Sequence, residues 1–370
     1  MNDTALLYKI AFASIRGMGY DLAHKILDVV PSEQEFFVAS EKELRKIISS
    51  KSKILEDSYR KALLDKAAKE IEFISINNIS LTYFTDSDYP QRLSNASDSP
   101  ILLYSKGECD LNSSKVISIL GTRHATPYGQ NFCDTFIKDL SKSIENLIIV
   151  SGLAYGIDIC AHRACLKYGI PTIAVLAHGL NTIYPAPHRS SAIDILHKGG
   201  KLVTEYKSTD KIHPGNFVAR NRIVAALADC TVVVESAEKG GSLITAAIAS
   251  SYNRDVFALP GRTSDNYSSG CNKIIRNNSA SLITSASDLV SAMRWKKKNE
   301  SKQATQKELF PNISSQEQII LDYLQQNDES HINMMCGVLS IPMSKLMSSL
   351  IELEFKGLIL SLPGGKYSLS

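Results

Sequence analysis

Two glycine-rich turns carry many of the residues that could do chemistry, and each precedes a segment with helical spacing. The first turn reads Ser-Gly-Leu-Ala-Tyr-Gly at residues 151–156, and the second reads Lys-Gly-Gly-Ser at residues 239–242. Glycine lets a ligand approach the backbone closely, and the first N–H groups of a helix together with its positive dipole end suit a phosphate. The turns therefore predict a site for an anion.

A third turn adds a positive charge. The apolar run at residues 116–120 ends in Gly121, Thr122 and Arg123. Gly121 permits a sharp turn. If Arg123 had only a structural role, it would pair with a nearby Asp or Glu. Because this Arg follows a buried strand directly, we expect Arg123 to contact the ligand.

A fourth group comes from the block at residues 216–222. Arg220 and Arg222 lie about 200° apart around a helix, so both cannot face one ligand. We expect one of them to bind and the other to pair locally, and the spacing leaves open which. Phe217 either stacks on a base or belongs to the core.

Several other patterns point away from catalysis. Asp158 and His162 are four residues apart and could be an acid/base couple, but the more ordinary interpretation is a helix-dipole carboxylate and a packed histidine. Ser242 has two interpretations as well, part of an anion site or an ordinary cap of the helix that follows. The turn at residues 151–156 matches neither the dinucleotide fingerprint nor the P-loop, and neither zinc spacing nor a G-x-S-x-G elbow is present.

The elements that must position these turns alternate between strand and helix over residues 79–292. Such alternation predicts an α/β fold with a doubly wound, mostly parallel sheet, whose carboxyl-terminal strand ends bring the turns into one crevice. The strand-like runs are residues 80–84, 115–120, 147–150, 172–176, 201–204, 231–235, 255–259 and 281–284.

The flanking segments read differently. Residues 1–78 are helical, and the turn at residues 15–19 has the shape of a helix-hairpin-helix element or of an ordinary tight turn. Residues 293–313 form a polar linker. Residues 314–370 read as three helices followed by a hairpin around Pro-Gly-Gly, which is the outline of a winged helix.

Composition sets wider limits. The chain has 370 residues, a net charge of +3, 44% hydrophobic and 21% charged residues, so it is globular and any basic footprint is local. The seven cysteines argue against a disulfide framework because their number is odd. We expect a cytoplasmic protein without a membrane span.

The combined motifs resemble a known family. S-G-L-A-x-G-I-D-x-x-A-H, T-I-A-V-L, Y-P, F-x-x-R-N-R-I, G-S-L-I-T-A and P-G occur in this order between residues 89 and 289, as in the DNA-processing protein A family, also called DprA or Smf. The resemblance implies a Rossmann-like domain that binds single-stranded DNA and dimerises, without catalysis, cofactor or metal. It also implies loading of the RecA recombinase during natural transformation.

Carried over by motif, the DNA-binding residues would lie on the turns described above and on their neighbours. They are Gly121, Thr122, Arg123, Ser151, Gly152, Leu153, Ala154, Tyr155, Gly156, Arg189, Asn216, Phe217, Arg220, Arg222, Lys239, Gly240, Gly241, Ser242 and Thr245. This chain has Tyr155 where the family often has Lys or Arg, so stacking can replace an ion contact there. It also has Ala177-His178-Gly179 in place of the family's Gly-Thr-Gly.

Two other functions compete with this one. A nucleoside-phosphate hydrolase of related fold would need a Glu after the second glycine-rich turn, and this chain has none there. A transcription regulator would use the winged helix on duplex DNA, yet its second helix, at residues 333–339, is poor in Arg and Lys. We therefore expect protein contacts from that unit.

Overall fold

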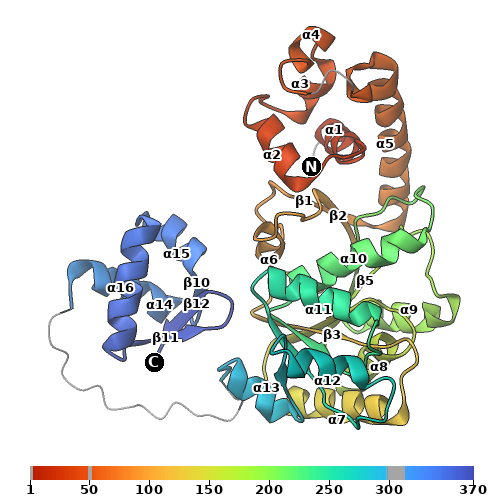
Figure 1. Ribbon diagram of the computed structural model, residues 1–370. Coiled ribbons are helices and arrows are strands. Elements are labelled where there is room, and N and C mark those ends of the chain that lie inside the picture. The colour runs from red at the N-terminus through yellow and green to blue at the C-terminus, as the bar shows by residue number, and fades with distance from the viewer. Residues whose placement is uncertain (1–2, 49–51, 297, 299–312) are drawn as a thin grey trace.

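The computed structural model describes residues 3–48, 52–296, 298 and 313–370 (Figure 1). A bundle of helices comes first and stands at one end of the sheet domain. Its elements are α1 (Asp3–Ala13), α2 (Tyr20–Leu27), α3 (Glu33–Val38), α4 (Glu41–Leu44), η1 (Lys53–Leu55) and α5 (Asp57–Asn77). Lys9 pairs with Asp86 at 2.6 Å, and the Glu70 carboxylate accepts hydrogen bonds from Ser208, so polar contacts join the bundle to the sheet domain.

The centre of the molecule is one sheet in the order β1-β2-β6-β5-β4-β3-β7-β8-β9. The strands from β6 to β9 are parallel, whereas β2 is antiparallel to both β1 and β6. The bounds are β1 (Ser80–Tyr83), β2 (Leu102–Gly107), β3 (Lys115–Leu120), β4 (Leu147–Ser151), β5 (Thr172–Val175), β6 (Lys201–Thr204), β7 (Cys230–Val233), β8 (Asp255–Ala258) and β9 (Ser281–Leu282).

The mostly parallel, doubly wound sheet confirms the predicted fold class, with one addition. Strand β2 was not among the predicted strands. It does not follow the strand–helix alternation, since no long helix separates it from β1 or β3, and the four-residue α6 (Gln91–Ser94) is the helix that precedes it. Its antiparallel place between β1 and β6 extends the sheet toward the helical bundle.

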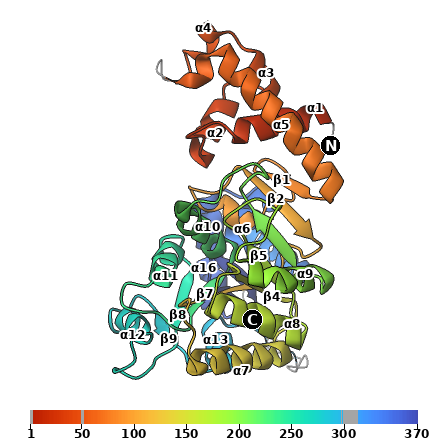
Figure 2. The same ribbon diagram turned by 90° about the vertical axis from the view of Figure 1, so that its right-hand side faces the viewer.

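Helices cover both faces of the sheet because successive strand residues point to opposite sides. Ile117 and Ile119 pack with α7 (Pro127–Ser143) and α8 (Ile157–Tyr168), whereas Val116 and Leu120 share a core with α10 (Pro214–Leu227) and α11 (Gly241–Ser251). Figure 2 shows these two helix pairs on opposite sides of the strands. The remaining elements of this domain are η2 (Ala186–His188), α9 (Arg189–His197), α12 (Ser269–Arg276) and α13 (Ala286–Ala292).

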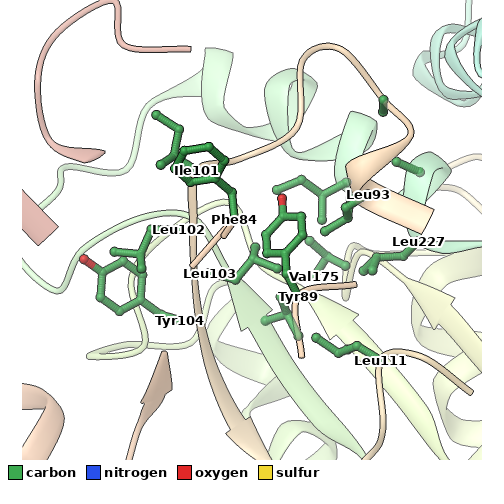
Figure 3. Close-up of a cluster of buried hydrophobic side chains, with 14 of the residues drawn as sticks. Phe84, Tyr89, Leu93, Ile101, Leu102, Leu103, Tyr104, Leu111, Val175 and Leu227 are labelled. Carbon is green, nitrogen blue, oxygen red and sulfur yellow. The ribbon is translucent and has the colours of Figure 1, made fainter. Parts of the chain in front are cut away.

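A cluster of aromatic and aliphatic side chains ties the antiparallel end of the sheet to α10. Figure 3 shows the Tyr89 ring among Leu93, Leu103 and Val175, with Leu227 of α10 nearby. The Tyr89 hydroxyl donates to the Pro100 carbonyl oxygen at 2.6 Å, so its one polar group is satisfied. This packing holds α10 against the sheet, and α10 carries several predicted site residues.

The carboxyl-terminal unit is a winged helix beside the sheet domain (Figure 1). It comprises α14 (Ser315–Gln326), β10 (Ser330–His331), α15 (Ile332–Leu339), α16 (Met343–Phe355), β11 (Ile359–Leu362) and β12 (Lys366–Leu369). Lys366 Nζ contacts the Ser114 carbonyl oxygen at 3.1 Å and lies 3.6 Å from Asp229. Both residues precede strands, so the wing meets the sheet at the amino-terminal strand ends. Most of the predicted linker at residues 293–313 lies outside the described residues.

Within the described ranges, no single helix is both long enough and apolar enough to cross a membrane. Helices α15 and α16 meet that length and composition together, but they are bent by 116°. All seven cysteines are free thiols.

Candidate functional site

A cavity of about 240 Å³ opens at the point where the strand order reverses. Strand β3 has β4 on one side and β7 on the other, and the chain leaves these strands in opposite directions around the sheet. Such a switch point forms a crevice at the carboxyl ends of the strands. The cavity is lined by Leu120, Gly121, Thr122, Arg123, Gly152, Ala154, Asp158, Phe217, Arg220, Asn221, Val224, Ala237, Gly240, Gly241, Ser242 and Thr245.

The start of α11 forms one wall of this cavity. Gly240 is the residue before the helix, and in the part of the chain that the structure describes no side chain accepts a hydrogen bond from the first helical N–H groups. The Ser242 hydroxyl instead bonds to the Ser236 hydroxyl at 2.7 Å, so Ser242 does not act as the cap. A methyl group added at Gly241 would meet no atom within 4 Å. The helix start is therefore open, and its N–H groups and dipole favour an anion.

Arg123 brings a positive charge to the same cavity. Its side chain is exposed, and its guanidinium carbon lies 5.8 Å from the centre of the Phe217 ring. Among the described residues, Arg123 forms no ion pair. An unpaired guanidinium beside an open helix start suits a phosphate, which accepts two parallel N–H bonds from arginine.

Glu235 holds the loop that carries Arg123. Its backbone oxygen accepts from the Thr122 N–H at 2.7 Å, and its carboxylate accepts from the N–H and the hydroxyl of Thr126 at 2.9 and 2.5 Å. Gly129 leaves room for that carboxylate, because a methyl group there would collide with it. Hydrogen bonds therefore join both ends of the loop, at Thr122 and Thr126, to Glu235, which follows β7.

The turn at residues 151–156 is arranged differently from the start of α11. The Asp158 carboxylate accepts hydrogen bonds from the N–H groups of Gly152 and Ala154 at 3.1 and 3.4 Å. Arg220 donates hydrogen bonds to the carbonyl oxygens of Gly152 and Val175. These N–H groups are engaged by a carboxylate of the chain itself, so this turn does not offer them to a phosphate.

Burial governs the ionisation of this inner pair. Asp158 and Arg220 are 8% and 4% exposed. Loss of solvent raises the pKa of the Asp158 carboxyl, although Arg220 and the two backbone N–H groups oppose that change. Loss of solvent likewise lowers the pKa of the Arg220 guanidinium, opposed by Asp158. The two charges stabilise each other beneath the cavity.

Glycines join the loops at two positions where no other residue fits. A methyl group at Gly121 would lie 2.5 Å from Ile157 Cγ1 and 2.8 Å from the Glu235 oxygen. Gly156 has a φ of 77°, and a methyl group there would collide with the Thr122 oxygen. These close approaches bring the β3 and β4 turns together.

His162 does not form a couple with Asp158. It is fully buried, and its Nδ1 lies 2.8 Å from the Thr172 hydroxyl, while its Nε2 has no partner among the described residues. Burial, with Arg220 and His188 nearby, lowers the pKa of His162 to about 3. The imidazole is therefore neutral, as a packed histidine would be.

The cavity includes eleven of the nineteen predicted site residues, and the other eight lie outside it. Ser151 donates to the Ile119 oxygen at 2.7 Å, and Leu153 is fully buried. Arg222 pairs with Glu205 at 2.5 Å. Hence Arg220 lies at the cavity while bonding to protein, and Arg222 pairs locally. The other predicted residues outside the lining are Tyr155, Gly156, Arg189, Asn216 and Lys239.

Sequence reasoning also missed five lining residues: Leu120, Asp158, Asn221, Val224 and Ala237. Asn221 lies between the two predicted arginines, so its place in that block was an available signal. For Asp158 the sequence predicted a partner of the helix dipole or half of an acid/base couple, and neither prediction included the cavity lining. No group of three or more His, Cys, Asp or Glu that could hold a metal ion occurs in the ranges that the structure describes.

The glycine turn of the helical bundle faces a second cavity, of about 500 Å³, between the bundle and the sheet domain. Gly17 and Gly19 line it on one side, and the other side includes Asp98, Glu205 and Arg222. Lys207 also lines this cavity, and Arg222 pairs with Glu205 at 2.5 Å, so the lining carries charges of both signs and does not select for or against a phosphate. The helix-hairpin-helix element and the ordinary tight turn both stay predictions.

Comparisons with known proteins match two parts of this chain to family models. A family model described as "DNA recombination-mediator protein A" matches residues 80–294, and one described as "DprA winged helix domain" matches residues 300–365. Protein Smf of Synechocystis sp. is 39% identical over 212 residues, which are 56% of this chain and 52% of that protein. This chain therefore spans about half the length of that relative.

Two relatives of the same kind have solved structures. DNA processing protein DprA of Streptococcus pneumoniae is 36% identical over 232 residues, 63% of this chain and 79% of that protein. Its X-ray structure superimposes with a TM-score of 0.63 at 28% identity, covering 77% of this chain and 96% of that one. DNA processing protein A of Helicobacter pylori, in a structure concerned with its single-stranded DNA binding mode, gives a TM-score of 0.51 at 29% identity, covering 58% and 94%.

Proposed function

Because the chain belongs to the DNA-processing protein A (DprA/Smf) family, we propose that it binds single-stranded DNA in the cavity between β3, β4 and α11. The observation that carries the proposal is the meeting of the unpaired Arg123 with the open start of α11. Both line the same cavity and both suit a phosphate, and the binding needs no base sequence because every nucleotide supplies a phosphate. The Helicobacter pylori relative, described by its single-stranded DNA binding mode, supports the same ligand.

The role in the cell follows from the family resemblance. We propose that the bound strand is handed to the RecA recombinase during natural transformation, that the chain dimerises through the Rossmann-like domain, and that it works in the cytoplasm. We propose no catalytic step, because the one carboxylate among the cavity-lining residues, Asp158, already accepts two backbone N–H groups.

The test compares a labelled single strand with a duplex of equal length at two salt concentrations. If about six phosphates are neutralised, log affinity against log salt has a slope near −4 for a single strand. The single strand should bind more tightly than the duplex. A flat salt response, or equal binding of the duplex, would contradict the proposal.

Arg123→Glu is the sharpest variant for this site. Replacing a phosphate contact with a carboxylate should weaken single-strand binding by about 100-fold, because one attraction is lost and one repulsion is added. Since Arg123 is exposed, the free energy of unfolding should stay within about 0.5 kcal/mol of the parent. Arg276→Glu, a change of equal charge on α12, outside the cavity, is the matched control.

The finer proposals have separate measurements. Loading is tested by RecA ATP hydrolysis on a single strand already covered by a single-strand-binding protein, which should start sooner when the protein is present. Dimerisation is tested by light scattering of the full chain. An unchanged lag in the first assay, or a monomeric mass in the second, would remove the corresponding proposal and leave DNA binding intact.

A further inference from the structure

Tyr184, which motif reasoning did not assign to the site, stands beside the cavity. Its ring centre lies 5.5 Å from that of Phe217 at an angle of 63°, and Phe217 lines the cavity. The guanidinium carbon of Arg123 lies 5.8 Å from the centre of the Phe217 ring. The row Tyr184–Phe217–Arg123 therefore leads from the surface of the molecule to the anion site.

Tyr184 is exposed in a way that core packing does not require. Half of its surface is accessible, and no hydrogen bond of its hydroxyl occurs among the described residues. Tyr155, 45% exposed, offers a second ring in edge contact with His188, at 4.8 Å between centres. Exposed rings beside a phosphate site suit bases, since every base has a face that stacks on an aromatic ring.

A buried histidine fixes the backbone of Tyr184. The Tyr184 N–H donates to His178 Nε2 at 3.1 Å, and His178 Nδ1 lies 2.9 Å from the Gly179 carbonyl oxygen. The second contact requires a proton on Nδ1, which leaves Nε2 as the acceptor for Tyr184. His178 is 1% exposed, and burial lowers its pKa, which favours this neutral form. The tyrosine is thus held in place before any ligand arrives.

We propose that Tyr184 and Phe217 form a base-stacking subsite next to the phosphate cavity, and that His178 is a positioning residue for it. The inference rests on the proposed function, because it needs a nucleic acid strand at Arg123. The loops concerned follow β3 and β5 and begin α10, all at one edge of the sheet. Phe217 lines the same cavity as the start of α11 and Tyr184 contacts Phe217, so a strand held by its phosphate at α11 passes beside these rings.

The experiment uses two labelled strands with equal numbers of phosphates, an oligo-dT and an abasic strand of the same length. The full-length protein should bind the oligo-dT more tightly. Tyr184→Leu should weaken oligo-dT binding by roughly fivefold or more while changing abasic binding less than twofold. Tyr184→Phe keeps the ring and should behave as the parent, and Arg123→Gln should weaken binding of both strands.

His178 is tested through the same preference. His178→Leu removes the acceptor for Tyr184 and should reduce the preference for oligo-dT over the abasic strand, whereas His178→Gln keeps an acceptor and should retain it. A role in folding alone would lower binding of both strands together. Circular dichroism of each variant identifies any that has lost its fold, and Tyr184→Leu carries the test in that case.

The outcomes separate the two proposals. If the parent protein binds neither strand, the proposed function fails. If the parent binds both strands but Tyr184→Leu weakens them equally, or weakens neither, the stacking subsite is wrong while phosphate binding stands.

Discussion

Two glycine-rich turns that look alike in sequence differ in what they offer to a ligand. Both follow a strand of the parallel sheet and both lead into a helix, α8 in one case and α11 in the other. At residues 151–156, Asp158 accepts hydrogen bonds from two loop N–H groups, those of Gly152 and Ala154, and Arg220 donates to the Gly152 oxygen. At the start of α11, no side chain among the described residues accepts from the first helical N–H groups.

The difference teaches that a glycine-rich turn is a candidate anion site only when the chain has not already supplied the anion. We call the closed turn at residues 151–156, together with Asp158 and Arg220, the frame, because its internal hydrogen bonds set the shape of the cavity. The open turn, together with Arg123, presents unpaired groups to the outside. Substitutions in the frame should therefore act on stability, and substitutions in the open part should act on binding.

The largest effect is expected from Gly156→Ala in the closed turn. The added methyl group would collide with the Thr122 oxygen and would force a side chain into a φ of 77°. The free energy of unfolding should fall by about 4 kcal/mol, as measured by urea denaturation. Gly199→Ala is the matched control, because Gly199 has a φ of 75° but no atom within 4 Å, so it should lose only about 1 kcal/mol.

Asp158→Asn should be the next largest. The amide oxygen can still accept a backbone N–H, but the buried Arg220 loses its counter-charge. We expect a loss of about 3 kcal/mol in the free energy of unfolding. An unchanged unfolding curve would mean that another group balances Arg220, and the frame described above would then be wrong.

A smaller, pH-dependent effect is expected from His162, behind the closed turn. Its folded pKa, about 3, lies below the unfolded value of about 6.5, so the unfolded chain takes up the proton first. Stability from this group is complete above about pH 6.5 and declines as the pH falls toward 3. Between pH 7 and pH 5 it should account for a loss of about 2 kcal/mol. His162→Leu should flatten that part of the curve, and equal slopes would contradict the assignment.

The smallest effect on stability is expected in the open turn. Gly241→Ala places a methyl group where no protein atom lies within 4 Å, so the free energy of unfolding should change by less than about 0.5 kcal/mol. Single-strand binding should nonetheless fall severalfold, because the methyl group stands where the strand would approach the backbone. Undiminished affinity would show that the strand does not reach this turn.

In the winged helix, prediction and structure agree. Its helices and hairpin occur where the periodicity placed them, since each has its own apolar face and a Gly-rich turn. On α16, the exposed residues include Met343, Met347, Ile351 and Phe355, four residues apart in each case. That surface is apolar, whereas reading a DNA groove needs polar or basic side chains. A protein contact of this unit stays a prediction.

Much of the fold was predictable because its signal is local. Strand β3 is a continuous apolar run, covered on both faces, and the turn after it ends in Gly and Arg. Strand β2 was missed because it breaks the strand–helix alternation and lies between β1, the preceding strand, and β6, which is distant in the sequence. Arg220 and Arg222 show the same limit: helix geometry separates them, but only the folded chain places Arg222 against Glu205.

The sequence alone determined where strands end, which turns lack side chains, and hence that these turns meet at the carboxyl edge of the sheet. Those properties depend on residue type and on spacing along the chain. The tertiary structure decided which N–H groups are already taken, because Asp158, Arg220 and Glu235 reach their partners through space. A hydrogen bond is a short-range contact between atoms, and only the folded arrangement determines which donors remain for a ligand.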